Sequence, residues 1–299
     1  MFYNLRKKLN LLYFNAKTNR IRNKANVATN PESKLIIVTL LCENDLNMYL
    51  VAISSLCRFV TPRKVVVVSD NLSEKSQNIL RSCIEGVKIL PVNECREPGL
   101  PIGGCWERLA TILRHLDEGY VMQMDADTIT LQRPDELLDA IDRNVSCTII
   151  SKPDCKKVTF SEIARLVSVW DSDHVQVDSE KALAECRQAE TRLYVRGCAA
   201  YTGFAQGSSG LNDLKSFSQE LEEKLGKERW RTWGTEQVAS NYIIANSPDS
   251  VLLPFELYPY YDPAKKNGNE NIKLFHFIGT HRFKEGKYLA LALELIGSL

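Results

Sequence analysis

The chain has 299 residues, of which 44% are hydrophobic and 25% are charged. This length and composition are typical of a folded globular protein with a large core. The formal net charge is only +1, which argues against nucleic acid as the main partner, because nucleic-acid-binding domains are strongly basic. The sequence contains no apolar run of about 18 residues, which excludes a membrane-spanning helix.

The nine cysteines are odd in number and include no CxxC pair. Several of them, such as Cys42, Cys57 and Cys147, lie within apolar runs. This pattern favours free buried thiols in a reducing compartment over a disulfide framework or a zinc site. The amino terminus lacks the apolar core and cleavage site of a secretory signal. We therefore predict a cytoplasmic protein.

The first 31 residues differ from the rest in charge, since they hold seven of the 38 basic residues and no acidic one. Residues 2–14 place apolar side chains at helical spacing around Arg6, Lys7 and Lys8. Such a segment lies on an anionic membrane surface, through residues 1–24, packs as a helix on its own domain, or is a frayed terminus. Residues 15–33 are polar and end in Asn30-Pro31, which is typical of a linker. We predict a basic arm and linker over 1–33 and one domain over 34–299.

From residue 34 onward, apolar and amphipathic segments alternate. Strands are expected at 35–42, 64–70 and 87–92, and helices at 44–60, from Ser73 onward and at 106–116. Near-continuous apolar strands between helices indicate a mostly parallel sheet covered on both faces. The predicted class is α/β, with a Rossmann-like nucleotide-binding half over 34–150. It contains neither GxGxxG nor GxxxxGK[ST], which argues against NAD-type and P-loop sites.

The second half, 151–299, is less regular and is predicted to bind the acceptor. The apolar pattern predicts strands at 147–151, 198–206, 251–254 and 272–279. Helices are expected at 161–170, 180–194, 211–225, 236–245 and 284–296, with a loop over 171–179.

The segment at 120–130 is a short apolar run that ends abruptly in two aspartates. Asp125 and Asp127 are separated by one alanine, so in an extended strand both side chains would point to the same side. Carboxylates at the carboxyl end of an α/β strand form a hard oxygen site for Mg²⁺ or Mn²⁺, and ligands bind at these strand ends. We interpret this pair as a metal site, with a plain strand-end turn as the alternative.

A single histidine, His276, lies within the apolar segment at 272–279. A histidine in such a strand is usually a hydrogen-bonded core residue, but Gly279, Arg282 and Lys284 follow it closely. A ligand followed by a flexible turn and cations is suited to a metal-bound phosphate. For the two cations, a solvated helix start is the alternative interpretation.

These motifs together resemble the metal-dependent glycosyltransferases of the GT-A fold. The similarity is to the family 8 enzymes, which are glycogenin- and galactosyltransferase-like, and to related bacterial nucleotide-diphospho-sugar transferases. It extends over about residues 35–284, with the aspartate pair and His276-Phe277-Ile278-Gly279 as its most specific parts. Two departures are visible. The family's Lys-Pro-Trp is replaced by Thr280-His281-Arg282-Phe283, and Glu236 stands where the family has aspartate.

The resemblance implies a transfer of a hexosyl group from a nucleotide-diphospho-sugar, most simply a UDP-sugar, to a glycan or lipid-linked acceptor. Asp125, Asp127 and His276 would hold Mn²⁺ or Mg²⁺ against the diphosphate. The residues implied to bind the donor are Thr39, Asn44, Asp70, Arg108, Gly203 and Lys284. Glu236 and Gln237 would act at the sugar, with Glu236 as the base of an inverting enzyme or as a positioning residue. A helix cap by Thr235, followed by Glu236 in the first turn, is the structural alternative.

Two other functions are compatible with parts of the pattern. The segment MQMDADTI approximates the hhhhDxDx[TV] loop of haloacid-dehalogenase-like phosphatases, in which the first aspartate is the nucleophile. That loop normally opens its domain, and no GDxxxD follows here. The second alternative is a non-catalytic protein that binds carbohydrate or sugar nucleotide.

Overall fold

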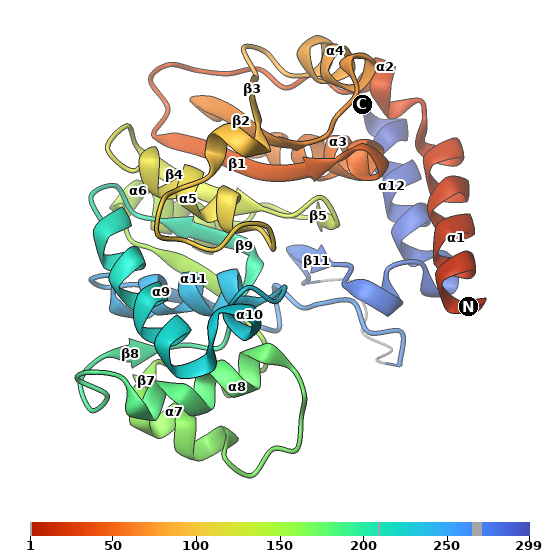
Figure 1. Ribbon diagram of the computed structural model, residues 1–299. Coiled ribbons are helices and arrows are strands. Elements are labelled where there is room, and N and C mark those ends of the chain that lie inside the picture. The colour runs from red at the N-terminus through yellow and green to blue at the C-terminus, as the bar shows by residue number, and fades with distance from the viewer. Residues whose placement is uncertain (1, 209, 265–270) are drawn as a thin grey trace.

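The computed structural model describes residues 2–208, 210–264 and 271–299, and is organised around a seven-stranded sheet (Figure 1). The strand order is β10-β6-β9-β4-β1-β2-β3. Only β9 runs antiparallel to its two neighbours, so the sheet is mostly parallel. The strands are β1 (Leu35–Cys42), β2 (Lys64–Asp70), β3 (Lys88–Pro91), β4 (Tyr120–Met124), β6 (Cys147–Ile150), β9 (Gly197–Phe204) and β10 (Val251–Leu253). The predicted α/β class is confirmed.

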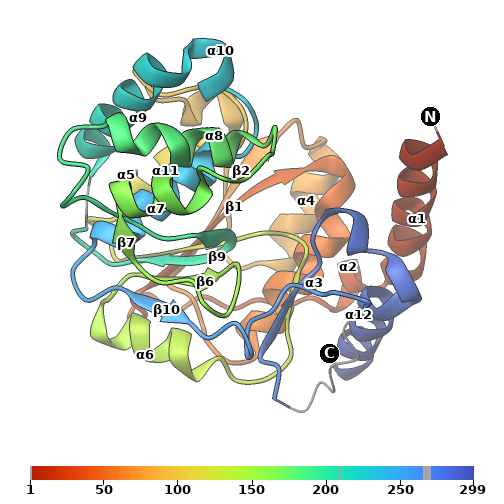
Figure 2. The same cartoon turned by 90° about the horizontal axis from the view of Figure 1, so that it is seen from below.

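The central strands are apolar on both faces because each face lies against a separate core. In β1, Leu35 and Ile37 belong to one core, and Ile36 and Val38 belong to the other. The first core includes residues of α1 (Phe2–Thr18), α2 (Ile21–Lys24), α3 (Leu46–Cys57), α4 (Glu74–Cys83), α6 (Asp135–Arg143) and α12 (Lys287–Ser298). The second includes residues of α5 (Trp106–Arg114), α7 (Phe160–Val167), α8 (Val175–Ala182), α9 (Leu211–Leu225), α10 (Lys227–Trp230) and α11 (Thr235–Asn246). Figure 2 shows these two groups of helices on opposite sides of the sheet.

The predicted helix at 180–194 is wrong. Helix α8 begins earlier, inside the expected loop, because the ring of His174 accepts a hydrogen bond from the Gln176 amide and Val175 and Val177 are buried. The chain leaves the helical conformation after 185 and passes through Gln188, whose φ is positive. It then forms β8 (Leu193–Tyr194), which pairs with β7 (Val158–Thr159). The polar composition of 171–179 concealed this helix start.

The basic arm packs on the domain. Phe14 is 1% exposed and stacks on Tyr288 of α12, with ring centroids 4.6 Å apart. Ile21 is also buried, and Lys24 donates a hydrogen bond to the Ile296 carbonyl. The first part of the linker predicted over 15–33 is therefore not free, because buried side chains between Thr18 and Val27 anchor it to the domain. Within the described part of the chain, no helix combines the length and apolar character needed to cross a bilayer.

Candidate metal and sugar-nucleotide site

The two aspartates lie in a turn, where the expected single strand over 120–130 is interrupted. Strand β4 ends at Met124, and β5 (Thr128–Thr130) leaves the main sheet to pair with β11 (Leu274–His276). Hydrogen bonds fix this turn at each residue. The Asp125 amide donates to the Ala200 carbonyl at 2.8 Å, and the Ala126 carbonyl accepts from the Tyr288 hydroxyl at 3.2 Å. The turn is therefore held by both the main sheet and α12.

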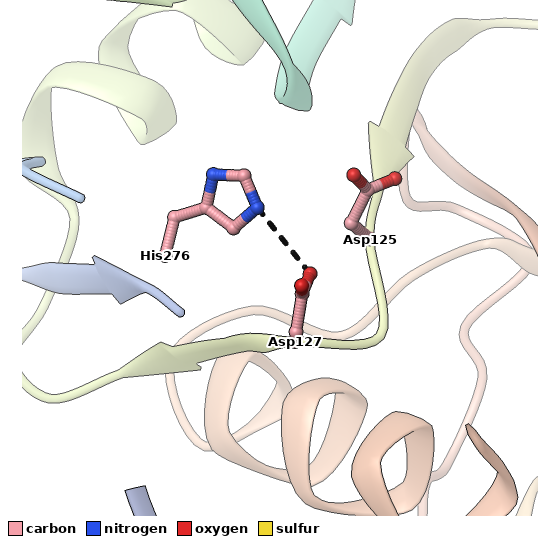
Figure 3. A group of neighbouring side chains, drawn as sticks. All are labelled: Asp125, Asp127 and His276. Carbon is pink, nitrogen blue, oxygen red and sulfur yellow. Dashed lines mark ion pairs between the residues drawn. The ribbon is translucent and has the colours of Figure 1, made fainter. Parts of the chain in front are cut away.

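The pairing of β5 with β11 brings His276 beside the aspartates. In this antiparallel pair His276 lies opposite Thr128, and the Phe277 amide donates to the Asp127 carbonyl at 2.8 Å. The His276 Nε2 atom is 3.3 Å from a carboxylate oxygen of Asp127. One ligand atom from each of Asp125, Asp127 and His276 lies within 4.8 Å of the others. Figure 3 shows these three side chains converging.

Arg108, on α5, lies behind the turn and bridges two acids. Its guanidinium donates to Asp125 and lies 3.4 Å from Glu236 on α11. Arg108 and Glu236 are 4% and 3% exposed. Burial raises the pKa of Glu236 to about 7 despite the attraction of Arg108. Arg108 stays charged, because its two acidic neighbours outweigh the effect of burial and raise its pKa.

Asp127 is held between two cationic groups. Its second carboxylate oxygen accepts a hydrogen bond from Arg282, 2.5 Å away. Burial alone would raise the pKa of Asp127, but His276 and Arg282 outweigh it and hold the pKa well below its ordinary value. Burial would also lower the pKa of His276, but Cys198 and Asp127 raise it well above its ordinary value. Cys198 lies 3.4 Å from the other ring nitrogen of His276.

A cavity of about 760 Å³ opens over this cluster. That volume is within the range of small-molecule and cofactor sites. Among the residues expected at the site, the cavity is lined by Arg108, Asp125, Asp127, Gln237 and His276. The remaining wall comes from both halves of the domain and from α1, and includes Lys7, Asp45, Gln176, Arg196, Cys198, Trp233 and Arg282.

A hydrogen-bonded chain orients Gln237 in the cavity wall. Its amide oxygen accepts from the Ala199 amide and its amide nitrogen donates to Gln176, both at 3.3 Å. Gln176 in turn donates to Glu180 at 3.0 Å, and Arg196 donates to the same carboxylate oxygen at 2.7 Å. A carboxylate only accepts hydrogen bonds, so the buried Glu180 determines which group donates and which accepts at each step of this hydrogen-bonded series. Sequence reasoning missed Gln176 and Arg196, which come from segments with no apolar strand to mark them.

Several expected donor-binding residues lie elsewhere. The hydroxyl of Thr39 is buried and donates to the Met124 carbonyl at 2.8 Å, so it supports the turn that carries the aspartates. Asn44 is exposed beside α1, where its carbonyl accepts from Asn15. Asp70 accepts a hydrogen bond from Asn71 at the end of β2. Lys284 is exposed in the short 3₁₀ helix η5 (Lys284–Gly286). Of the two late cations, Arg282 and not Lys284 reaches the cluster.

Gly203, expected beneath the donor sugar, lies in the core beside Tyr120. A Cβ atom added to Gly203 would lie 2.6 Å from the Tyr120 Cζ atom. Tyr120 is 1% exposed and its hydroxyl donates to the Val145 carbonyl, so moving its ring aside would disturb the core and break this hydrogen bond. We expect Gly203→Ala to lower the free energy of unfolding by about 1–3 kcal/mol or more.

Urea denaturation measures the effect of Gly203→Ala, and the double variant Gly203→Ala/Tyr120→Val supplies the control. Removing the ring leaves room for the new methyl group, so the two effects should be strongly non-additive. Additive losses would mean that Tyr120 is not the obstacle.

The raised pKa of Glu236 predicts an unusual pH dependence of stability. Its pKa changes from an ordinary value of 4.5 to about 7 on folding. Between these values the folded protein binds more protons, so this group lowers stability as the pH rises. We expect the free energy of unfolding of Glu236→Gln to match that of the wild type near pH 5 and to exceed it by roughly 3 kcal/mol near pH 8. Urea denaturation at both pH values measures this, with the exposed Glu223→Gln as the matched control. An equal difference at both pH values would contradict the shift.

The fold is shared with solved glycosyltransferases. The apo bifunctional glycosyltransferase WbbM is 14% identical with a TM-score of 0.55, over 91% of this chain and 51% of that one. An active-site mutant of LgtC is 12% identical with a TM-score of 0.53, over 88% of this chain and 96% of that one. Apo GlyE of Streptococcus pneumoniae TIGR4 is 14% identical with a TM-score of 0.52, over 89% of this chain and 60% of that one. This chain thus spans about half the length of the WbbM chain.

These similarities define the class of the fold. The chain has the GT-A fold of glycosyltransferases, with an Asp-Asp-His group that can hold a metal ion at the end of β4. No protein-family model matches the chain, and no curated protein sequence matches it. The phosphatase alternative fits the structure less well, because the aspartates follow the fourth strand in the chain and not the strand that opens the domain, and Asp125, its expected nucleophile, is paired with Arg108.

Proposed function

We propose that this protein transfers a sugar from a nucleotide-diphosphate donor to a glycan or lipid-linked acceptor. One observation carries the proposal: Asp125, Asp127 and His276 converge at the wall of the large cavity of a GT-A fold. Arg108 and Arg282 lie beside the two aspartates and supply positive charge at the same place. Such a site is suited to a ligand that is both anionic and metal-bound, which describes the diphosphate of a sugar nucleotide.

The chemistry of the donor set fits a divalent ion. Two carboxylates provide hard oxygen ligands, and one imidazole provides nitrogen. This mixture fits Mn²⁺ better than Mg²⁺, which prefers an all-oxygen octahedral shell. When bound, the ion would act as a Lewis acid that stabilises the charge developing on the leaving diphosphate. Asp125, Asp127 and His276 are the residues that would hold it.

The arginines provide the rest of the leaving-group stabilisation. Arg282 has a planar guanidinium whose several donors suit phosphate oxygens. Arg108 contributes its charge from behind Asp125, and because it is buried it acts in a low dielectric. Charge placed in advance where negative charge develops is an effective way to lower the barrier of such a reaction.

We assign different roles to the two residues expected at the sugar. Gln237 lines the cavity with its amide oriented by Gln176 and the Ala199 amide. Glu236 is buried beneath Arg108. This burial favours Glu236 as a positioning residue for Arg108 over a base on the acceptor hydroxyl. A hexosyl group on UDP is the donor that we expect.

The test is the release of nucleotide from a panel of UDP-, GDP-, CMP- and dTDP-sugars with Mn²⁺, followed by chromatography. We expect slow donor hydrolysis with one nucleotide class, accelerated by the right acceptor. No release from any donor, together with hydrolysis of a generic phosphate ester, would favour the phosphatase. Nucleotide binding with no turnover in the presence of glycan and lipid extracts would favour a non-catalytic binding protein.

A further inference from the structure

Helix α1 carries apolar residues on two opposite faces. One face packs on the domain through Leu11, Phe14 and the buried Thr18. Figures 1 and 2 both show α1 at the edge of the molecule next to α12, with its other side turned away from the protein. Packing within this chain therefore accounts for the apolar residues on the inner face of α1 but not for those on its outer face.

The outer face of α1 is apolar and exposed. Leu9, Leu12 and Tyr13 are 57%, 56% and 57% exposed, although large apolar side chains are usually buried. At helical spacing these three lie together on one side of the helix, opposite Phe14. Exposed basic residues border them on both sides, with Lys8 on one and Arg6 and Lys17 on the other. We name the surface formed by Leu9, Leu12 and Tyr13 with these three basic residues the outer α1 face.

We propose that the outer α1 face binds the surface of an anionic lipid bilayer. An interfacial helix of this kind buries its apolar residues at the headgroup boundary and pairs its basic residues with anionic lipids. The charge distribution selects this occupant. Residues 1–31 contain seven basic residues and no acidic one, so a second copy docked through the same face would place like charges against each other. Such an arrangement is repulsive, whereas an anionic bilayer is complementary.

The position of α1 relates this surface to the cavity. Lys7 follows Arg6 in the chain and lines the cavity that contains the aspartates. Lys7 is on the inner side of α1, opposite to the outer α1 face, so a bilayer bound to that face would lie one helix diameter, roughly 10 Å, from this wall of the cavity. If the proposed glycosyl transfer is correct, this arrangement selects a lipid-linked acceptor over a soluble glycan. The membrane contact itself does not depend on the proposed function.

The experiment is co-sedimentation of the full chain with vesicles in the absence of nucleotide. One set contains phosphatidylcholine alone, and the other an equal mixture of phosphatidylcholine and phosphatidylglycerol. We expect binding to the anionic vesicles only, weakened by added salt because exposed charges are screened. Leu9→Ser/Leu12→Ser should weaken binding about tenfold or more. Leu166→Ser/Val169→Ser, which alters residues 50% and 85% exposed elsewhere, should bind as the wild type does.

A second pair of changes tests the electrostatic part independently. Lys8→Ala/Lys17→Ala leaves the apolar surface intact and should reduce binding to anionic vesicles several-fold. The melting temperature of each variant shows that it is folded. Wild-type protein that ignores anionic vesicles, or equal binding by the Leu9/Leu12 variant, would overturn the proposal. A wild-type dimer that Leu9→Ser/Leu12→Ser converts to monomer would assign the face to a second copy instead. Nucleotide binding is measured separately, so failure of the membrane contact and failure of the proposed function remain distinguishable.

Discussion

Replacing Asp127 by alanine is expected to abolish metal-dependent nucleotide binding and to lower sugar transfer by about a thousandfold or more. Asp127 connects the aspartate turn to β11 and the segment that follows it, because its carboxylate contacts both His276 and Arg282. Its loss removes a metal ligand and also leaves two cationic side chains without their acidic partner. We therefore expect a lower affinity for Mn²⁺ as well as a lower turnover.

Mn²⁺ affinity, measured by electron paramagnetic resonance, separates these effects from a general loss of structure. The matched control is Asp139→Ala, which removes an exposed aspartate that pairs with Arg143 on α6. Unchanged Mn²⁺ affinity in the Asp127 variant would mean that the ion does not bind at this cluster.

Replacing Arg108 is expected to produce the largest loss of stability. The variant Arg108→Met leaves Asp125 and Glu236 facing each other without the cation that lies between them. Removing one partner from a buried ion pair typically costs about 3–5 kcal/mol. Because Arg108 is buried behind the aspartate turn, we also expect sugar transfer to fall by about two orders of magnitude.

A second change separates the two consequences of losing Arg108. The double variant Arg108→Met/Glu236→Gln removes the buried acid that Arg108 compensates. At pH 8 it should therefore gain more stability over Arg108→Met than Glu236→Gln gains over the wild type. Sugar transfer should stay low, since the cation beside the proposed diphosphate site is still missing. Urea denaturation and a turnover assay measure the two quantities on the same samples. Recovery of both, or loss of neither in the single variant, would contradict the role given to Arg108.

The sequence predicted the framework of the fold because the central strands are marked by composition. The segments at 35–42 and 64–70 became β1 and β2 with the same bounds, since buried parallel strands are apolar on both faces. The helix at 211–225 was equally clear from its amphipathic pattern and became α9. Segments whose structure depends on tertiary contacts were less predictable. The start of α8, the shortness of β11 and the packing of residues 18–27 of the predicted linker are of this kind.

The candidate site was predictable where chemistry and strand pattern coincide. The aspartates after β4 and the histidine in β11 are polar residues in otherwise apolar segments, which made them visible in the sequence. The family resemblance implied donor contacts for Thr39 and Gly203, but a motif does not show how deep a residue lies in the fold. In the structure Thr39 supports the aspartate turn and Gly203 packs in the core. The cavity wall from Gln176, Arg196 and Trp233 comes from helices and loops that meet only in the folded chain.

The most direct test of the central claim is thermal stabilisation by UDP, GDP, CMP and dTDP, each with and without Mn²⁺, for wild type and Asp127→Ala. A ligand that binds only the folded state raises its melting temperature, by an amount set by its concentration and affinity. We expect one nucleotide to stabilise the wild type in a manganese-dependent manner and to have no effect on the variant. Stabilisation that is equal without Mn²⁺, or equal in the variant, would contradict a sugar-nucleotide site built on Asp125, Asp127 and His276.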